Sequence, residues 1–195
     1  MERDLYTLLV FDKQRFAGFE EQPLTIPYID PQGHTHTYTP DVLIHFNADP
    51  VTGHQLPPML AEVKYRIDLF AEWKDLKPKF KAARAFSRER GWQRFSIFTE
   101  NEIRTPYLSN ANFLLLYERT ELVPDEVNLL LDNLAALRTA TPQSLLLACS
   151  KDIMRGAELM PVLWRLITLK RIGCNLDERL TMVSPIWTLG SETLI

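Results

Sequence analysis

Several features that mark specialised classes of protein are scarce or missing in this 195-residue sequence. The two cysteines, Cys149 and Cys174, have no partners at metal-ligand spacing, which favours buried thiols in a reducing compartment over a disulfide or a zinc site. The longest apolar stretches, such as 113–117 and 145–149, are far too short to span a membrane. The first residues do not combine a basic region with an apolar run, so we expect no secretory signal and a cytoplasmic location.

A general excess of positive charge is also missing, because 22 basic residues stand against 25 acidic ones and the formal net charge is −3. This balance argues against a protein whose whole surface is basic. The segment 64–94 departs from it, with ten Lys or Arg against four acids, an excess of six. Such a segment in a mildly acidic protein favours a local phosphate contact, although a solvated helix face gives the same pattern.

The first sixty residues combine one helical pattern with two strand patterns. Residues 1–12 carry apolar side chains at helical spacing. Residues 21–29 and 34–46 alternate between apolar and polar, and the turn residues 30–33 between them predict a hairpin. Residues 47–58 are rich in Pro, Gly and Asp and predict a loop.

The next segments complete an α/β pattern. Residues 59–65 predict a buried strand, and residues 71–90 predict a helix that Pro78 kinks or divides. Residues 94–99 and 113–117 predict two further strands. Together these segments predict an α/β fold with a mixed sheet.

The character of the chain changes near residues 120–124, and the rest is mainly helical. Three helices are predicted at about 124–137, 142–154 and 158–171, with a tight turn at Arg155-Gly156 and a small hairpin at about 180–187. This order predicts a winged-helix module, although small helical bundles give the same pattern. We therefore expect a domain at 1–119 and a second, helical domain at 120–195.

The residues that indicate chemistry are Pro40-Asp41 and, twenty-one positions after Asp41, Glu62-Val63-Lys64. Glu62 and Lys64 are two apart on the predicted strand, so both side chains leave the same face. An unpaired charged side chain inside an apolar strand lowers the stability of the fold by several kcal/mol, as an order of magnitude. A charged pair at this position therefore indicates a functional role. The plainer alternative is a surface ion pair between Glu62 and Lys64, which the apolar flanking residues disfavour.

If the two strands pair, Asp41 and Glu62 can bind one Mg²⁺, with the carbonyl of Val63 as a further oxygen ligand. Lys64 beside the ion would orient or deprotonate the attacking water and offset charge in the transition state. This arrangement resembles the PD-(D/E)xK nuclease core. The order of strand, polar loop, apolar ExK strand and basic helix supports this interpretation more than the short motif does.

Longer stretches of the sequence resemble the TnsA endonucleases of heteromeric transposases. The run 1–12 is similar to the first catalytic helix of that family, and Phe19-Glu20-Glu21-Gln22-Pro23-Leu24 is similar to the turn that follows it. Residues 38–44 resemble the family's metal-binding aspartate strand, residues 60–66 its ExK strand, and residues 95–103 its next core strand. The resemblance spans residues 2–117 and extends more loosely into the helical tail.

The resemblance implies a restriction-endonuclease-like core that depends on Mg²⁺, with Mn²⁺ able to substitute. Glu2 would be the helix carboxylate, Asp41 and Glu62 metal ligands, and Lys64 the catalytic lysine. It also implies cleavage of the non-transferred strand at the 5′ side of transposon ends. The implied partners are DNA, a DDE transposase subunit resembling TnsB and an AAA+ ATPase regulator resembling TnsC, with no membrane.

The basic residues supply candidates for DNA contact in both predicted domains. Those on the helix after the ExK strand are Lys74, Lys77, Lys79, Lys81 and Arg84. Those in the tail are Arg165, Lys170 and Arg171.

Three alternatives remain open at this stage. Glu20 and Glu21 are substitute carboxylates if Glu2, at the first turn of its helix, is poorly held, although their position in a turn favours a structural role. The same core would also serve a nuclease of restriction, repair or phage systems that acts alone. A weakened core used as an assembly adaptor is the third possibility, and the terminal position of Glu2 motivates it.

Overall fold

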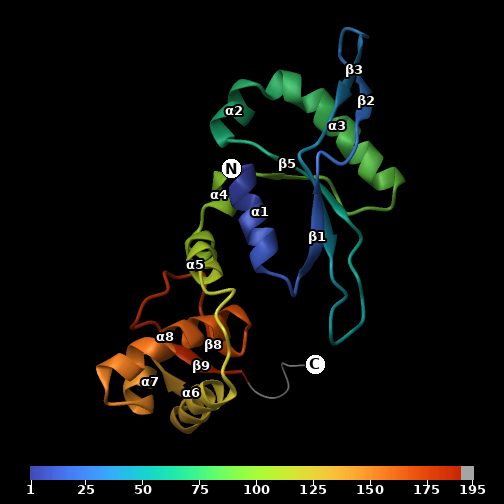
Figure 1. Cartoon of the computed structure of the whole chain (residues 1–195). Helices are drawn as coiled ribbons and strands as arrows, with labels where there is room; N and C mark the ends of the chain where they lie inside the picture. Colours follow the sequence, from blue (N-terminus) through green and yellow to red (C-terminus); the bar gives the residue numbers. More distant parts are fainter. Residues whose placement is uncertain (190–195) are drawn as a thin grey trace. The chain divides into compact units, whose positions relative to one another are not determined.

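A four-stranded mixed sheet forms the centre of the N-terminal part of the chain (Figure 1). The structure is a computed structural model that describes residues 1–189. It divides the chain into one unit from Met1 to Arg104 and a second that begins at Thr105, earlier than the expected boundary at 119/120. The elements of the first unit are α1 (Glu2–Phe11), β1 (Phe16–Glu21), β2 (Ile26–Ile29), β3 (Thr35–Tyr38), β4 (Val42–Phe46), β5 (Met59–Val63), α2 (Arg66–Ala71), α3 (Trp73–Glu89), β6 (Ser96–Phe98) and α4 (Glu100–Ile103).

The strand order of this sheet is β1-β4-β5-β6, with β5 and β6 parallel and the other neighbours antiparallel. The predicted mixed sheet is therefore confirmed. Strand β1 corrects the sequence analysis, which assigned the last residues of this strand to a turn. Gly18 and two successive glutamates weaken the strand signal, and this segment becomes a strand through its pairing with β4.

The predicted hairpin is real but shorter than expected. Strands β2 and β3 form a separate two-stranded sheet around the turn at residues 30–33, where Gly33 has a φ of 91°. The long strand expected at 34–46 is divided at Pro40, which has no N–H to continue a ladder. Strand β4 begins two residues later and joins the main sheet.

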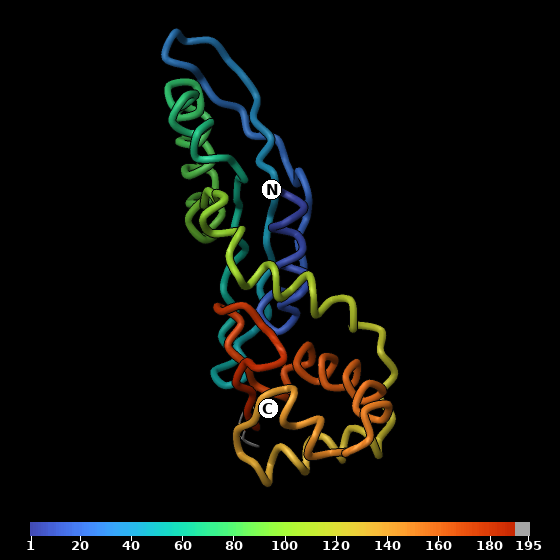
Figure 2. The backbone as a smooth tube through the Cα atoms, turned by 90° about the vertical axis from the view of Figure 1, so that its left-hand side faces the viewer, coloured from blue at the N-terminus to red at the C-terminus, as the bar shows by residue number. Residues whose placement is uncertain are grey.

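Helices cover both faces of the main sheet, since α1 and α3 lie on opposite sides of its strands (Figure 2). Leu43 on β4 and Leu60 on β5 are directly opposite each other and share one core cluster with Phe80 of α3. These residues therefore define the face of the sheet that α3 covers. Alternate residues such as Val42 and Ala61 are buried on the other face.

The helix predicted at 71–90 exists, but Pro78 does not interrupt it. α3 runs from Trp73 to Glu89 through Pro78, and the break from α2 lies at Glu72 instead. Burial of Leu76, Phe80 and Ala83 along one face stabilises the helix across the hydrogen bond that Pro78 cannot donate. Gly91, with a φ of 68°, follows its C-terminus.

The second unit contains helices around a small three-stranded sheet of order β7-β9-β8. Its elements are α5 (Pro106–Leu115), α6 (Pro124–Leu137), β7 (Thr139–Ala140), α7 (Pro142–Cys149), α8 (Ile153–Thr168), β8 (Ile172–Cys174) and β9 (Ile186–Thr188). The strand predicted at 113–117 is wrong, because this segment ends helix α5, where Phe113 packs edge-on against Trp164 of α8. The turn predicted at Arg155-Gly156 is also wrong, since both residues lie inside α8 and the break is at residues 150–152.

The predicted hairpin at 180–187 is partly correct. Strand β9 lies there, but its antiparallel partners are β8 and β7, and Leu180 precedes the strand in a loop. Asn110 of α5 fixes this loop. Its amide donates to the carbonyls of Leu176 and Glu178 at 2.8 and 2.7 Å, and its Oδ1 accepts from the N–H of Leu180 at 2.9 Å.

The length and polarity of each helix decide whether it could cross a membrane. Among residues 1–189, none of the helices combines the length and the apolar character that crossing a bilayer requires.

Candidate active site

The end of the sheet where β4 begins and β5 ends brings Asp41 and Glu62 together. Val42 pairs with Ala61, and Leu43 with Leu60, in an antiparallel ladder. Continuing this register by one residue sets Asp41 opposite Glu62, and opposite residues of an antiparallel pair share a face. That face is the one that α3 covers, because Leu43 and Leu60 belong to it.

Glu62 is a buried carboxylate, with only 5% of its surface exposed. Its Oε2 accepts a hydrogen bond of 2.5 Å from the hydroxyl of Tyr38, and its Oε1 lies 3.4 Å from Nζ of Lys79. Burial and the charge of Glu62 raise the pKa of Tyr38 well above its usual range, so this phenol stays a donor. Both oxygens of Glu62 thus have partners that hold the carboxylate in place.

Asp41 is held at the start of β4 by the neighbouring strand. Its Oδ2 accepts from the N–H of Val63 at 2.7 Å. Burial first, and then the charges of Glu62 and Glu2, raise the pKa of Asp41 to about 6, against the opposing effects of the Val63 N–H and of Lys79. The charge of Asp41 is therefore incompletely compensated in the folded protein.

Glu2 reaches the same region from the first turn of α1. Its side chain is exposed, and its charge acts on both Asp41 and Tyr6. Burial and the charges of Glu21, Glu2 and Asp41 raise the pKa of Tyr6 to about 12. Tyr6 also stacks on Phe19 of β1 with ring centroids 4.7 Å apart, which anchors the N-terminal turns of α1 to the sheet.

Lys64 lies just beyond β5, and its contact differs from the expected one. Its Nζ forms an ion pair with Oε2 of Glu72 at 3.0 Å, and this bond raises the pKa of Lys64. The lysine that contacts Glu62 is Lys79. The simple ion pair between Glu62 and Lys64 is thus not the arrangement that the structure contains. Val63 contributes its N–H to Asp41, and the expected role of its carbonyl stays a prediction.

The substitute carboxylates Glu20 and Glu21 lie on strand β1 instead of in a turn. Glu20 pairs with His45 at 2.7 Å between Oε1 and Nε2. Glu21 is paired in the ladder with Val42, next to Asp41, and is exposed. Glu21 therefore shares the face of Val42, which is not the face of Asp41 and Glu62, and its charge acts on Tyr6 together with those of Glu2 and Asp41. Glu20 has a partner of its own.

Asp41 and Glu62, with Glu2 close enough for its charge to act on Asp41, offer the oxygen ligands that a hard divalent cation prefers, but among residues 1–189 the oxygens of these three carboxylates do not all lie within 4.8 Å of one another. Mg²⁺ and Mn²⁺ prefer carboxylate and carbonyl oxygens, and a few such ligands suffice because water completes the shell. The raised pKa of Asp41 reflects burial together with repulsion between these carboxylates. A cation bound between them would remove that repulsion.

Comparison with family models decides what kind of protein carries this site. The model described as TnsA-like endonuclease N terminal matches residues 14–100, and the model described as TnsA endonuclease C terminal matches residues 102–176. The chain belongs to the TnsA endonuclease family. The N-terminal model includes Asp41, Glu62 and Lys64, whereas Glu2 precedes the residues that it matches. A search of curated proteins finds no match.

Membership of the TnsA family implies nuclease activity, DNA binding and partners of the Tn7-type transposase. The surface of α3 is relevant to the second of these. Five basic side chains follow each other along it at intervals of three and four residues, so they form one stripe on the helix. All five are exposed, and we call them the α3 ridge: Lys74, Lys77, Lys81, Arg84 and Arg88.

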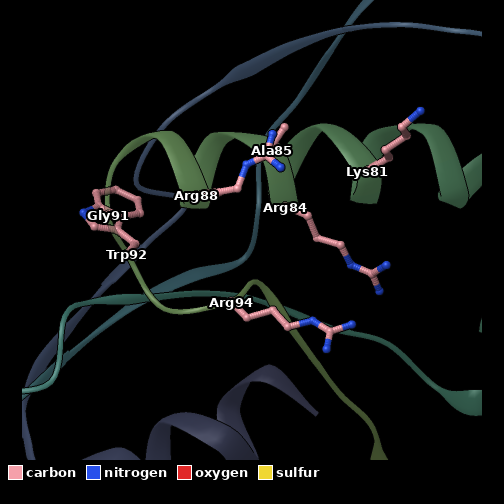
Figure 3. Close-up of a pocket in the computed structure, with 7 residues that line it drawn as sticks. All are labelled: Lys81, Arg84, Ala85, Arg88, Gly91, Trp92 and Arg94. Carbon is pink, nitrogen blue, oxygen red and sulfur yellow. The ribbon is translucent and has the colours of Figure 1, made fainter.

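The C-terminal end of the ridge borders an open pocket of about 550 Å³. Its lining includes Lys81, Arg84 and Arg88 of the ridge, together with Trp92 and Arg94. Arg84 extends from α3 and Arg94 from the loop before β6, and both point in the same direction (Figure 3). Four cationic side chains in one pocket favour a polyanion such as the phosphate backbone of DNA.

The remaining predicted DNA contacts are placed differently. Lys79 does not lie on the α3 ridge, since its ammonium contacts Glu62 and the ring of Tyr38. Arg165 lies in the last turn of α8 with a buried Nε, and Lys170 and Arg171 follow that helix half-buried.

The sequence predicted Lys79 as a DNA contact only, and it did not single out Tyr38, Arg88 or Arg94. Tyr38 and Lys79 are partners of Glu62, but they come from different elements and no motif links them. Arg88 continues the ridge, and its i+7 spacing from Lys81 was a usable signal. Arg94 joins the pocket only through the fold.

Proposed function

We propose that this TnsA-family chain is the Mg²⁺-dependent nuclease subunit of a transposase, which hydrolyses the non-transferred strand at the 5′ side of transposon ends. The observation that carries the proposal is the register that sets Asp41 opposite Glu62 in a chain of an endonuclease family. Hydrolysis would leave a 5′-phosphate and a 3′-hydroxyl.

Each residue of the cluster has a role in this proposal. Asp41 and Glu62 hold the cation, with Glu2 and the carbonyl of Val63 as further ligands. The bound ion supplies Lewis acidity that activates water and neutralises charge on the phosphate. Lys64 keeps its proton at neutral pH, because its ion pair with Glu72 raises its pKa, so it orients water and offsets developing charge instead of acting as a base.

DNA contacts are proposed on both units. The α3 ridge would follow the phosphate backbone in the first unit. In the second, the order helix–strand–helix–helix–strand–strand from α6 to β9 supports a winged-helix arrangement. In this arrangement α8, which carries Arg165, corresponds to the recognition helix, and Lys170 and Arg171 follow it directly.

The family also supports partners for the reaction. A TnsB-like DDE transposase would cut the transferred strand, and a TnsC-like AAA+ ATPase would regulate the pair. A nuclease of this kind should cut little on its own, because uncontrolled cleavage of transposon ends would break the donor DNA.

A nicking assay on transposon-end DNA tests the proposal. With Mg²⁺ and the cognate transposase, we expect the wild-type chain to cut the non-transferred strand, and Asp41→Asn and Lys64→Ala to lose cleavage while keeping the wild-type circular dichroism spectrum. Efficient cutting without any partner would favour a nuclease that acts alone. Partner binding by a wild-type chain that never cuts would favour an assembly adaptor.

A further inference from the structure

The β2–β3 hairpin carries a second cluster of metal-binding side chains. One face of this hairpin begins in the core with Ile26 opposite Tyr38 and continues with Tyr28 opposite His36. The backbone N–H of Asp30 then bonds to the carbonyl of His34 at 3.0 Å, which extends the same register to the turn. The side chains of Asp30, His34 and His36 therefore meet on one face.

Two imidazole nitrogens converge on one carboxylate oxygen in this cluster. Nδ1 of His34 lies 3.2 Å from Oδ2 of Asp30, and Nε2 of His36 lies 2.8 Å from the same atom. One ligand atom from each residue lies within 4.8 Å of the others. Metal–nitrogen and metal–oxygen bonds of about 2.1 Å place neighbouring ligands about 3.0 to 3.4 Å apart, so small rotations would admit an ion.

The surroundings hold the cluster in this arrangement. Oδ1 of Asp30 accepts the backbone N–H groups of Gln32 and His34 at 2.9 and 2.8 Å, which leaves Oδ2 directed at the imidazoles. Tyr28 stacks on His36 with ring centroids 5.4 Å apart, and this contact fixes the second ring. The side chain of Asp30 is only 18% exposed, whereas those of His34 and His36 are 72% and 46% exposed, so water can complete the shell of an ion.

We propose that Asp30, His34 and His36 bind a divalent transition-metal ion of the Zn²⁺, Co²⁺ or Ni²⁺ class. Two imidazoles and one carboxylate suit these ions, whereas Mg²⁺ prefers oxygen ligands alone. The site is distinct from the Asp41–Glu62 pair and does not depend on the nuclease proposal. Because Asp30 follows β2 directly and His36 lies on β3, the ion ties the turn of the hairpin together.

Nuclear magnetic resonance of the histidine side chains tests this site on the full chain. The sequence has four histidines, so His45 and His54 are internal references. On titration with diamagnetic Zn²⁺, we expect the ring signals of His34 and His36 to shift or broaden at substoichiometric ion, while those of His45 and His54 stay unchanged. Equal effects on all four rings would overturn the proposal.

Calorimetry with Zn²⁺ gives the second measurement, on wild type and on chains with Asp41→Asn to separate the two sites. We expect His36→Gln and Asp30→Asn each to weaken Zn²⁺ binding by about tenfold or more, and His54→Gln to leave it unchanged. Loss of binding with Asp41→Asn but not with His36→Gln would assign the ion to the carboxylate pair and contradict the proposal. No Zn²⁺ binding at all would mean that the cluster only hydrogen-bonds its own turn.

Discussion

Lys79 of α3 lies with its Nζ 3.4 Å from Oε1 of Glu62 on β5. The same ammonium lies 4.7 Å from the centre of the Tyr38 ring, and the hydroxyl of Tyr38 donates to the other oxygen of Glu62. The charge that stabilises the buried carboxylate therefore comes from a helix instead of from the ExK strand. Lys64 is left at the rim of the site with Glu72.

The charges around Asp41 should move its pKa in opposite directions when they are removed. Lys79 lowers the pKa of Asp41 and Glu2 raises it, and all effects together, burial first, bring this pKa to about 6. We expect Lys79→Met to raise this pKa and Glu2→Gln to lower it. Carboxyl carbon shifts in a pH titration of the metal-free protein measure both effects, and pKa changes of the same sign would contradict the geometry.

The hydroxyl of Tyr38 should contribute to stability. Tyr38→Phe leaves Oε2 of the buried Glu62 without its donor, which we expect to lower the free energy of unfolding by about 1–3 kcal/mol. Urea denaturation measures the change. Tyr28→Phe, on the same hairpin, is the matched control and should cost less than about 0.5 kcal/mol. Equal losses of unfolding free energy in the two variants would show that the hydrogen bond to Glu62 contributes no more to stability than the hydroxyl of Tyr28.

The ionisation of Asp41 should make the fold less stable as pH rises. Because its folded pKa is raised to about 6 from an ordinary value of 3.8, the folded state binds the proton more tightly than the unfolded state does. Its favourable contribution is present below about pH 4 and is lost as pH rises through about 6. In a metal chelator, we expect Asp41→Asn to be more stable than wild type by about 1 kcal/mol at pH 7.5, after allowance for solvent screening.

The difference between these two proteins should shrink to a small remainder when the same denaturation is repeated at about pH 4, because Asp41 is then largely protonated, and so uncharged, in the folded protein. A difference that is constant across this range would mean that Asp41 titrates normally.

The α3 ridge should determine how DNA affinity depends on salt. Lys81→Gln combined with Arg84→Gln removes two proposed phosphate contacts, so we expect the slope of log affinity against log salt to fall by about 1 for each contact. Arg90→Gln removes one charge from the end of the same helix, outside the ridge, and should leave the slope unchanged. Fluorescence anisotropy with transposon-end duplex measures both, and equal slopes in all three proteins would exclude the ridge from the interface.

Much of the first unit followed from the sequence because most of its strands have clear apolar patterns. The pairing of β4 with β5 sets Asp41 opposite Glu62, and the role of these two residues as metal ligands stays a prediction. Strand β1 could not be found in the same way, since its stability comes from a partner more than twenty residues away.

The errors in the second unit have a common cause. A short apolar run such as 113–117 suits a strand or a buried helix equally, and only its packing against Trp164 decides. Gly156 suggested a turn, but the cap from Asp152 and the burial of Leu159 and Leu163 keep α8 continuous. The partners of Glu62 were missed because Tyr38 and Lys79 meet it only in the folded chain.

Binding of Mn²⁺ measured by calorimetry tests most directly whether Asp41 and Glu62 share one cation. Chains with His34→Gln and His36→Gln remove the contribution of the hairpin. In that background we expect one ion to bind, and Asp41→Asn and Glu62→Gln each to weaken it by about tenfold or more. Unchanged Mn²⁺ affinity in both variants would contradict a shared metal site and with it the nuclease mechanism.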